Sequence, residues 1–495
     1  MSAVEKPPIV MAEPAGLSVE DRAWVLAIVA EKDRLIDELR GEAAALRVRV
    51  AELEAELRMT RKTPWNSSRP PSTEHPHANT AGAGEAAAKP GSTKKRKRGG
   101  QPGHPKHERP LVPVEQCDEV VPLKPTECRG CGATLRGDDP EPLRHQVWEL
   151  PQPQPVITEY QRHRLTCGGC GRSTCAELPE GVPEHMSGPR LIAVTAVLMG
   201  LFRQSKSRTA LALGSLFGVP CCPAWVVKQQ QRATLALKPC YDEVQAALPR
   251  AAVVHCDETP FQQGTAKAWI WTMVAGTFTF FKVSLTRAAV VPLALLGRAF
   301  AGAVVTDRYA GYNAFNNRRQ VCWAHLKRDF QSLIDAGGDG AVIGHRLMTS
   351  LKEMFHLWHL HRAGRIRHDT LRKKIESACW SQVYQTLEDG QRCRHAPTVS
   401  LCNDLLARFD QLWLFLEIPG LEPTNNRGER SLRHAVNWRK LSFGTQSESG
   451  SRFVETLLTV LETCRQQQRH PIDFLTAAIE AFAANKPTPK LLAGV

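Results

Sequence analysis

The chain has 495 residues, too many for one hydrophobic core, and this length predicts three or four folded units joined by linkers. Its 64 basic and 50 acidic side chains give a formal net charge of +14, which favours nucleic acid as a partner, although a merely basic soluble enzyme has the same balance. The longest apolar runs, such as residues 191–202, are too short to span a bilayer, and residues 1–16 lack the pattern of a secretory signal. We therefore expect a cytoplasmic protein with no membrane partner, whose 15 cysteines are reduced thiols or metal ligands rather than disulfides.

The first predicted element is a coiled coil over residues 23–60, after a disordered segment over residues 1–22. The region is rich in Ala, Leu, Glu and Arg, contains no proline, and repeats apolar residues every seven positions. The two series of this heptad pattern are Ile36, Ala43, Val50, Leu57 and, three positions later, Leu39, Leu46, Leu53. Such spacing is typical of a parallel leucine zipper and predicts a homodimer or higher oligomer. The alternative is a single amphipathic helix that lies on the body of the protein.

Residues 61–110 are dense in Pro, Gly, Ser and Thr and cannot bury a core, so they predict a flexible basic linker. The linker contains a run of five basic residues, Lys94, Lys95, Arg96, Lys97 and Arg98. Contact with DNA phosphates and a solvated charged tail both explain such a run.

Residues 111–186 predict a zinc-binding domain. Two C-x2-C pairs, Cys128 with Cys131 and Cys167 with Cys170, stand 36 positions apart (167 − 131), with short β-like segments at 146–150 and 156–165 between them. Four thiolates at this spacing suit a tetrahedral structural Zn²⁺. Cys117 and Cys175 are spare thiols nearby, and His163 or His185 is an alternative ligand.

Residues 187–250 show helical periodicity interrupted at Gly218, Val219 and Pro220. A helix, a short turn containing glycine and a second helix form the outline of a helix-turn-helix, which predicts a DNA-binding region. Many other helical domains share this outline.

A change of pattern at residue 251 predicts the first part of a catalytic core, residues 251–330. Asp257 follows one apolar strand and Asp307 another. Two such strands side by side bring their carboxylates together, which is unfavourable unless the carboxylates share a metal ion. Glu429, at the start of a predicted helix, completes an oxygen site for Mg²⁺ or Mn²⁺. Glu258 points to the opposite side of its strand from Asp257 and is expected to matter less.

The remaining segments complete the predicted organisation. Residues 331–420 read as a helical insertion, 421–447 as the part of the core that carries the Glu429 helix, and 448–495 as C-terminal helices. The separation of Asp307 from Glu429 is 122 positions (429 − 307), far more than a single crossover requires.

Together these motifs resemble the transposases of the insertion sequence 66 family over most of the chain. The zipper, the linker motifs at 66–72 and 99–104 and the paired cysteines carry the resemblance in the first half. In the second half it rests on short motifs at residues 257–259, 307–312, 322–325, 423–426 and 429–440. Gly428 departs from the family pattern, which usually has alanine before the glutamate; near a helix end we expect the glycine to be tolerated.

The resemblance implies a multidomain α+β protein whose RNase H-like α/β core carries an α-helical insertion. In the chain, this core comes after a coiled coil, a zinc-binding module and a helix-turn-helix region. It also implies a bacterial DDE-type transposase that acts at the nucleoid on double-stranded DNA, both element ends and target, with accessory proteins from the same element. Two metal ions at Asp257, Asp307 and Glu429 would support DNA strand cleavage and strand transfer. The chain has no G-x-x-x-x-G-K-[ST] loop for a nucleotide cofactor.

Further residues are candidates for auxiliary roles. His325 either orients a carboxylate or contacts the scissile phosphate, or is simply a packed residue at a strand end. Four basic residues on or after the Glu429 helix are expected to meet DNA phosphates: Arg430, Arg433, Arg439 and Lys440.

Two other classes of function remain open at this point. One is an RNase H-like DNA nuclease that cuts without strand transfer. The other is a non-catalytic, zinc-containing DNA-binding regulator. The first would not need three modules before the core, and the second would not need the three carboxylates.

Overall fold

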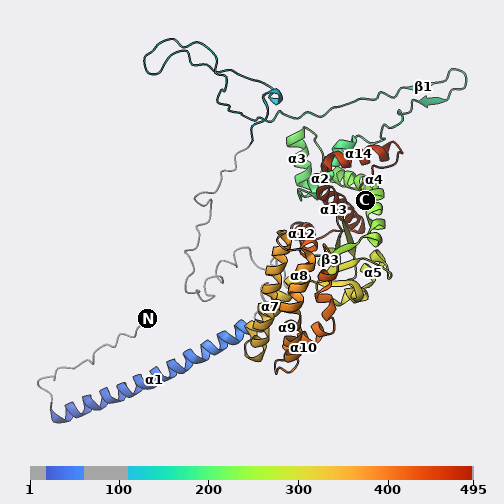
Figure 1. The fold of residues 1–495 in the computed structure, drawn as a ribbon. Helices are drawn as coiled ribbons and strands as arrows, with labels where there is room; N and C mark the ends of the chain where they lie inside the picture. Colours follow the sequence, from blue (N-terminus) through green and yellow to red (C-terminus); the bar gives the residue numbers. More distant parts are fainter. Residues whose placement is uncertain (1–17, 61–109, 493–495) are drawn as a thin grey trace. The chain divides into compact units, whose positions relative to one another are not determined.

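The computed structural model describes residues 18–60 and 110–492 (Figure 1). The chain forms two compact units. The first unit contains the first helix, Thr234–Phe482 and the chain from Lys486 onward. The second unit runs up to Ala233 and includes Ala483–Asn485. Within the described ranges, no helix combines the length and the apolar character needed to cross a membrane.

Helix α1 (Val19–Thr60) is a single helix of 42 residues, which confirms the helix predicted from residue 23 and starts it at Val19. Ser18 caps it, because its Oγ accepts from the amide of Asp21 and donates to the Asp21 carboxylate. Four residues of the heptad pattern are exposed to solvent by 44–65%: Ile36, Leu39, Leu46 and Val50. Since these apolar side chains are not buried within one chain, the coiled coil stays a prediction that requires a partner helix.

The second unit contains the cysteine pairs and the helical region predicted from 187. Helices α2 (Pro189–Gly200) and α3 (Lys206–Phe217) are followed by a turn and by α4 (Pro223–Ala247), which continues into the first unit. Gly218 ends α3 with a φ of 64°, a left-handed conformation that glycine adopts without strain. The predicted order of helix, glycine turn and helix is therefore confirmed, while its use as a DNA-binding motif stays a prediction.

Strand formation near the cysteines is more limited than predicted. The unit has one two-stranded antiparallel ladder, β1 (Arg164–Thr166) with β2 (Ser173–Cys175). The β-like segment at 146–150 forms no strand, and the segment at 156–165 does so only from Arg164. The prediction of strands there was wrong because apolar residues such as Val147 and Val156 have no partner strand and remain 82% and 96% exposed.

The first unit is a mixed α/β structure built on a five-stranded sheet. Its strands are β3 (Val253–Gln263), β4 (Ala266–Val274), β5 (Thr279–Ser284), β6 (Ala303–Thr306) and β7 (Arg319–Val321). Their spatial order is β5-β4-β3-β6-β7. The first three form an antiparallel meander, whereas β6 and β7 run parallel to β3. The strands predicted before Asp257 and before Asp307 are thus confirmed as β3 and β6, although β3 extends beyond Asp257.

The edge strand β5 is covered by α13 (Glu448–Gln466). Three side chains spaced four residues apart on α13 accept hydrogen bonds from alternate backbone amides of β5. The pairs are Glu455 with Val283, Thr459 with Phe281 and Thr463 with Thr279, at 2.8, 3.0 and 3.2 Å. These contacts satisfy the edge amides that would otherwise be open to another strand.

The helices between β7 and Glu429 share a core with the sheet. Trp323, Leu326 and Phe330 of α6 pack with Val305 and Val321 of the strands in one buried cluster that also includes the later helices. The helices of this insertion are α6 (Trp323–Ala336), α7 (Gly338–Arg362), α8 (His368–Ile375), α9 (Ser381–Gly390), α10 (Ala396–Leu406) and α11 (Leu414–Glu417). A π-helical turn, Glu376–Trp380, joins α8 to α9. The insertion is therefore built onto the sheet.

The remaining elements are short helices in the connections and the last helices of the chain. They are α5 (Val290–Leu296), α12 (Asn426–Ser442) and α14 (Pro471–Ala483), with 3-10 turns at Val114–Gln116, Leu248–Arg250, Ala310–Arg318 and Phe409–Leu412.

Candidate active site

Asp257 lies on β3, and Asp307 directly follows the neighbouring parallel strand β6. The register of β3 with β6 pairs Val253 with Ala303 and His255 with Val305. Continued by two residues, this register puts Asp257 opposite Asp307, which directly follows β6. The sequence predicted that the strand ends before Asp257. In the structure Asp257 lies within β3, because β3 continues to pair with β4 as far as Gln263.

The third carboxylate, Glu429, lies in the first turn of α12. Its Oε1 is buried without a hydrogen-bond partner and lies 3.6 Å from Nδ1 of His325. Cys322 Sγ, His325 and Glu429 present ligand atoms within 4.8 Å of one another. Helix α6 and helix α12 therefore bring His325 beside the predicted third carboxylate.

The electrostatics of Asp257 favour a cation at this position. Burial raises the pKa of Asp257 well above its usual value, and the charges of Glu258, Asp307 and Glu429 raise it further. A divalent cation would relieve this repulsion and would satisfy the unpartnered Oε1 of Glu429. Oxygen donors of this kind suit Mg²⁺. In the described residues the three carboxylates do not form a group whose ligand atoms all lie within 4.8 Å of one another, so the magnesium site stays a prediction.

His325 is a cationic side chain that interacts with these carboxylates, and its charge acts to lower the pKa of Asp257. Burial acts to lower the pKa of His325, but Cys322, Glu429 and Asp307 raise it to about 10. The imidazole is therefore protonated at neutral pH and partly balances the charge of Glu429.

Glu258 is paired with side chains from distant segments, whereas Asp257 Oδ1 accepts from the backbone amide of Glu258 at 3.0 Å. The Glu258 side chain is only 2% exposed, pairs with Arg287 at 2.7 Å and accepts a hydrogen bond of 2.6 Å from the Tyr312 hydroxyl. Burial raises the pKa of Glu258, and Asp307 adds to this effect. Its carboxylate thus makes a buried ion pair and a hydrogen bond, which its position on the strand did not reveal.

Asn425 connects the strand ends to the Glu429 helix. Its side-chain amide donates to the carbonyl of Cys256 at 2.7 Å, its backbone amide donates to Cys322 Sγ at 3.1 Å, and its carbonyl accepts from the amide of Glu429 at 3.0 Å. A Cβ added at Gly428 would meet Asn425 Oδ1 at 2.7 Å, so the glycine permits this close approach. The motif at 423–426 was noted in the sequence, but the role of Asn425 was not.

Arg319 holds the loop that carries Asp307, a role that no motif in the sequence indicates. It is fully buried, and its guanidinium donates to Thr306 Oγ1 and to the carbonyls of Asp307 and Tyr309 at 2.6–3.0 Å. A fourth bond goes to Asn313 Oδ1 at 2.9 Å. A planar group with five donors can satisfy four acceptors at once.

We expect Arg319→Lys to lower the free energy of unfolding by about 2–4 kcal/mol, because lysine cannot reach all four acceptors and leaves buried carbonyls unsatisfied. Chemical denaturation of the purified chain measures the effect. The exposed neighbour Arg318 provides the control, since Arg318→Lys removes no buried partner. Equal stability of the two variants would contradict a role for Arg319 in holding the Asp307 loop.

The predicted DNA-contacting residues fall into three groups. Arg430, Arg433 and Lys440 are exposed on α12. Arg439 instead donates to Thr259 Oγ1 and to the Pro260 carbonyl, both at 2.9 Å, so its guanidinium is anchored to β3. The basic run Lys94, Lys95, Arg96, Lys97 and Arg98 lies outside the described residues.

Each cysteine pair adopts the same local turn. Cys128 donates its amide to Ala133 and accepts from Gly132, and Cys167 does the same with Arg172 and Gly171, all at 2.9 Å. The backbone amide of the second cysteine in each pair, followed by that of the preceding glycine, lowers the pKa of Cys128 and of Cys167, which favours thiolate ligands.

The two turns are not assembled into one site in this structure. In the described part of the chain, no three of the four thiols of Cys128, Cys131, Cys167 and Cys170 lie within 4.8 Å of one another. Each pair is therefore a formed half-site, and a four-thiolate zinc site stays a prediction.

Comparison with known proteins identifies the family of the chain. The profile of the Transposase IS66 family matches residues 185–452, which is more than half of the chain and includes all three carboxylates. The chain belongs to the IS66 family of transposases. Membership implies a DNA-processing enzyme that binds DNA.

The other matches are consistent with this family, and their names state no activity. Two uncharacterized proteins of Sinorhizobium fredii, y4qI and y4hP, are 24% and 25% identical over 418 and 410 residues. Each match covers 76% of this chain and 74% or 73% of the relative. Residues 23–110 match a family of unknown function, DUF6444, so the match covers most of α1 and residues 61–110.

Proposed function

We propose that this member of the IS66 family is a DDE-type transposase that cuts DNA at element ends and joins the ends to target DNA. The observation that supports the proposal is the β3–β6 register, which when continued puts Asp257 opposite Asp307, together with the charges of Asp307 and Glu429 that act on Asp257. All three are required for a shared metal site, and one of them has a buried, unpartnered oxygen.

The order of the strands supports an RNase H-like core. An antiparallel meander of three strands, extended on the side of its first strand by two parallel strands, is the arrangement expected of that fold. In this proposal α6–α11 form the helical insertion between the second aspartate and the glutamate, and α13 completes the core by covering β5.

The mechanism assigns a role to each side chain. Asp257, Asp307 and Glu429 would hold two Mg²⁺ or Mn²⁺ ions, and such ions would supply Lewis-acid activation of the attacking oxygen and stabilisation of the leaving oxygen. Arg319 keeps the Asp307 loop in position, and Asn425 keeps the start of α12 against β3.

The proposed reaction has two steps. In the first, water attacks a phosphorus at the element end, a new P–O bond forms, and the bond to the 3′-oxygen breaks and leaves a 3′-hydroxyl. In the second, that hydroxyl attacks a phosphorus of the target, a new P–O bond joins the strands, and the target's own 3′-oxygen leaves. In this proposal His325, whose Nδ1 lies 3.6 Å from Glu429 Oε1, orients this carboxylate.

The direct test uses DNA that carries the repeats flanking the gene. With Mg²⁺, the purified chain and any accessory proteins of the element should first release a 3′-hydroxyl and then give a joined product with target DNA. Cleavage without joining would favour a nuclease, and binding without cleavage would favour a regulator.

We also propose that α1 forms a homodimeric coiled coil through its heptad pattern. Replacing both Leu39 and Leu46 with Glu should convert the dimer into a monomer in dilute solution, because like charges would oppose each other in the apolar seam. Sedimentation velocity measures the mass. Ala45→Glu, on an exposed position away from the seam, should leave the dimer intact. An oligomer that survives the double substitution would exclude the zipper as its basis.

A further inference from the structure

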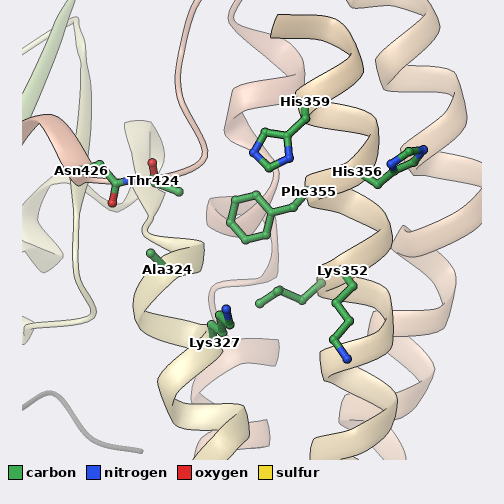
Figure 2. Close-up of a pocket in the computed structure, with 9 residues that line it drawn as sticks. Ala324, Lys327, Lys352, Phe355, His356, His359, Thr424 and Asn426 are labelled. Atoms are coloured by element: carbon green, nitrogen blue, oxygen red, sulfur yellow. The ribbon is translucent and has the colours of Figure 1, made fainter. Parts of the chain in front are cut away.

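A cavity of about 520 Å³ lies in the insertion next to the candidate active site. It is bounded by α6, by α7 and by the segment that begins α12, with Lys327, Lys352, Phe355, His359, Thr424 and Asn426 among its lining residues. In Figure 2, Phe355 and His359 extend from α7 toward the segment that contains Thr424 and Asn426. The volume falls within the range of about 300–1,000 Å³ that is typical of small-ligand pockets.

The chemistry of the cavity suits one nucleotide of DNA. Among the described residues that line it, two are lysines, two are histidines and none is acidic. The rings of Phe355 and His359 are stacked, with centroids 6.1 Å apart and planes inclined by 24°. Any unstacked base can stack on an aromatic ring, and cationic side chains attract its phosphate.

The position of the cavity links it to the carboxylates. Asn426 and Glu429 are three residues apart on α12 and therefore share a helix face. Ala324, another lining residue, directly precedes His325, whose ring nitrogen is 3.6 Å from Glu429. A strand with its scissile phosphate at Glu429 would bring an adjacent nucleotide to the mouth of the cavity.

We propose that this cavity captures an unpaired nucleotide next to the scissile phosphate, with its base against Phe355 and His359 and its phosphate near Lys327 and Lys352. The proposal rests on the DNA-cutting function given above and deepens it. An unpaired nucleotide separates the two strands beside the bond to be cut, and a base held on an aromatic ring fixes the register of that bond.

The test measures DNA binding by the full-length chain without added Mg²⁺. One probe is a blunt duplex, and the other is the same duplex with two splayed nucleotides at one 3′ end, one of them 2-aminopurine. Phe355→Leu retains an apolar side chain against the core that Phe355 partly fills, but it removes the ring. We expect about a 10-fold loss of affinity for the splayed probe, loss of the quenching of 2-aminopurine and unchanged affinity for the blunt duplex.

Matched variants control for folding and for general charge. Phe355→Trp should keep the preference for the splayed end, and Phe482→Leu, at an exposed phenylalanine of α14, should have no effect. Replacing both Lys327 and Lys352 with alanine should lower the slope of log affinity against log salt for the splayed probe by an amount that corresponds to about two phosphate contacts. The control replaces Lys373 and Lys374 of α8, which are exposed, with alanine.

A wild-type chain that binds both probes equally, or a Phe355→Leu variant that weakens both equally, would overturn the proposal. These outcomes are independent of catalysis, because no step requires cleavage. A chain that never cuts DNA but shows the Phe355-dependent preference would refute the catalytic proposal and leave the cavity as a DNA-binding site.

Discussion

Replacing any one of Asp257, Asp307 or Glu429 by its amide should reduce DNA cleavage and joining by about 10³-fold or more, while DNA binding persists. Each substitution removes both a charge and a ligand from a shared metal site, so the loss should be large for each residue alone. Binding rests on Lys and Arg contacts to phosphate, and the loss of a carboxylate nearby should leave it equal or stronger. A gel assay with DNA that carries the flanking repeats measures binding and cleavage for the same samples.

The control for this experiment is Glu448→Gln. Glu448 is also in the first turn of a helix, α13, but it is exposed and is not part of the carboxylate group. Glu258→Gln is a poor control despite its position next to Asp257, because its buried carboxylate pairs with Arg287 and Tyr312 and its loss should lower stability. Cleavage by the Glu429→Gln variant at the wild-type rate would refute the assignment of the third ligand.

Removing zinc should unfold the cysteine-containing segment and leave the sheet unit folded. The two half-sites have matching backbone turns, and the pKa values of Cys128 and Cys167 are lowered, but no residue of the segment 111–186 is buried. The binding free energy of a structural zinc would then supply much of the stability of this segment. Purified chain should contain about one zinc per molecule, and a chelator or Cys128→Ser should make the segment sensitive to proteolysis.

Cys175→Ser is the matched control in the same segment. Cys175 lies in β2, outside both C-x2-C pairs, and its replacement should leave the zinc content unchanged. A loss of zinc in this variant would place Cys175 in the ligand set instead of one of the four predicted cysteines. A zinc-free chain whose segment resists proteolysis would contradict the zinc site altogether.

The sequence by itself determined the elements whose pattern is local. The heptad spacing predicted α1, and the glycine and proline break after residue 217 separated α3 from α4. The apolar runs before Asp257 and Asp307 predicted β3 and β6, because a buried parallel strand needs apolar side chains on both faces. The family resemblance rested on short motifs of the same kind, and the match over residues 185–452 confirmed it.

Only the tertiary structure decided which groups are paired with which. The segment at 146–150 has a strand-like composition but forms no strand, since a strand requires a partner that the sequence cannot specify. Asp257 and Glu258 are adjacent in the chain, yet only Glu258 receives an arginine and a tyrosine from distant segments. Arg319 and Asn425 act through hydrogen bonds to backbone atoms, and such contacts leave no residue pattern to recognise. Their partners come together only when β6, β7 and α12 have packed, because these contacts depend on long-range geometry rather than on local periodicity.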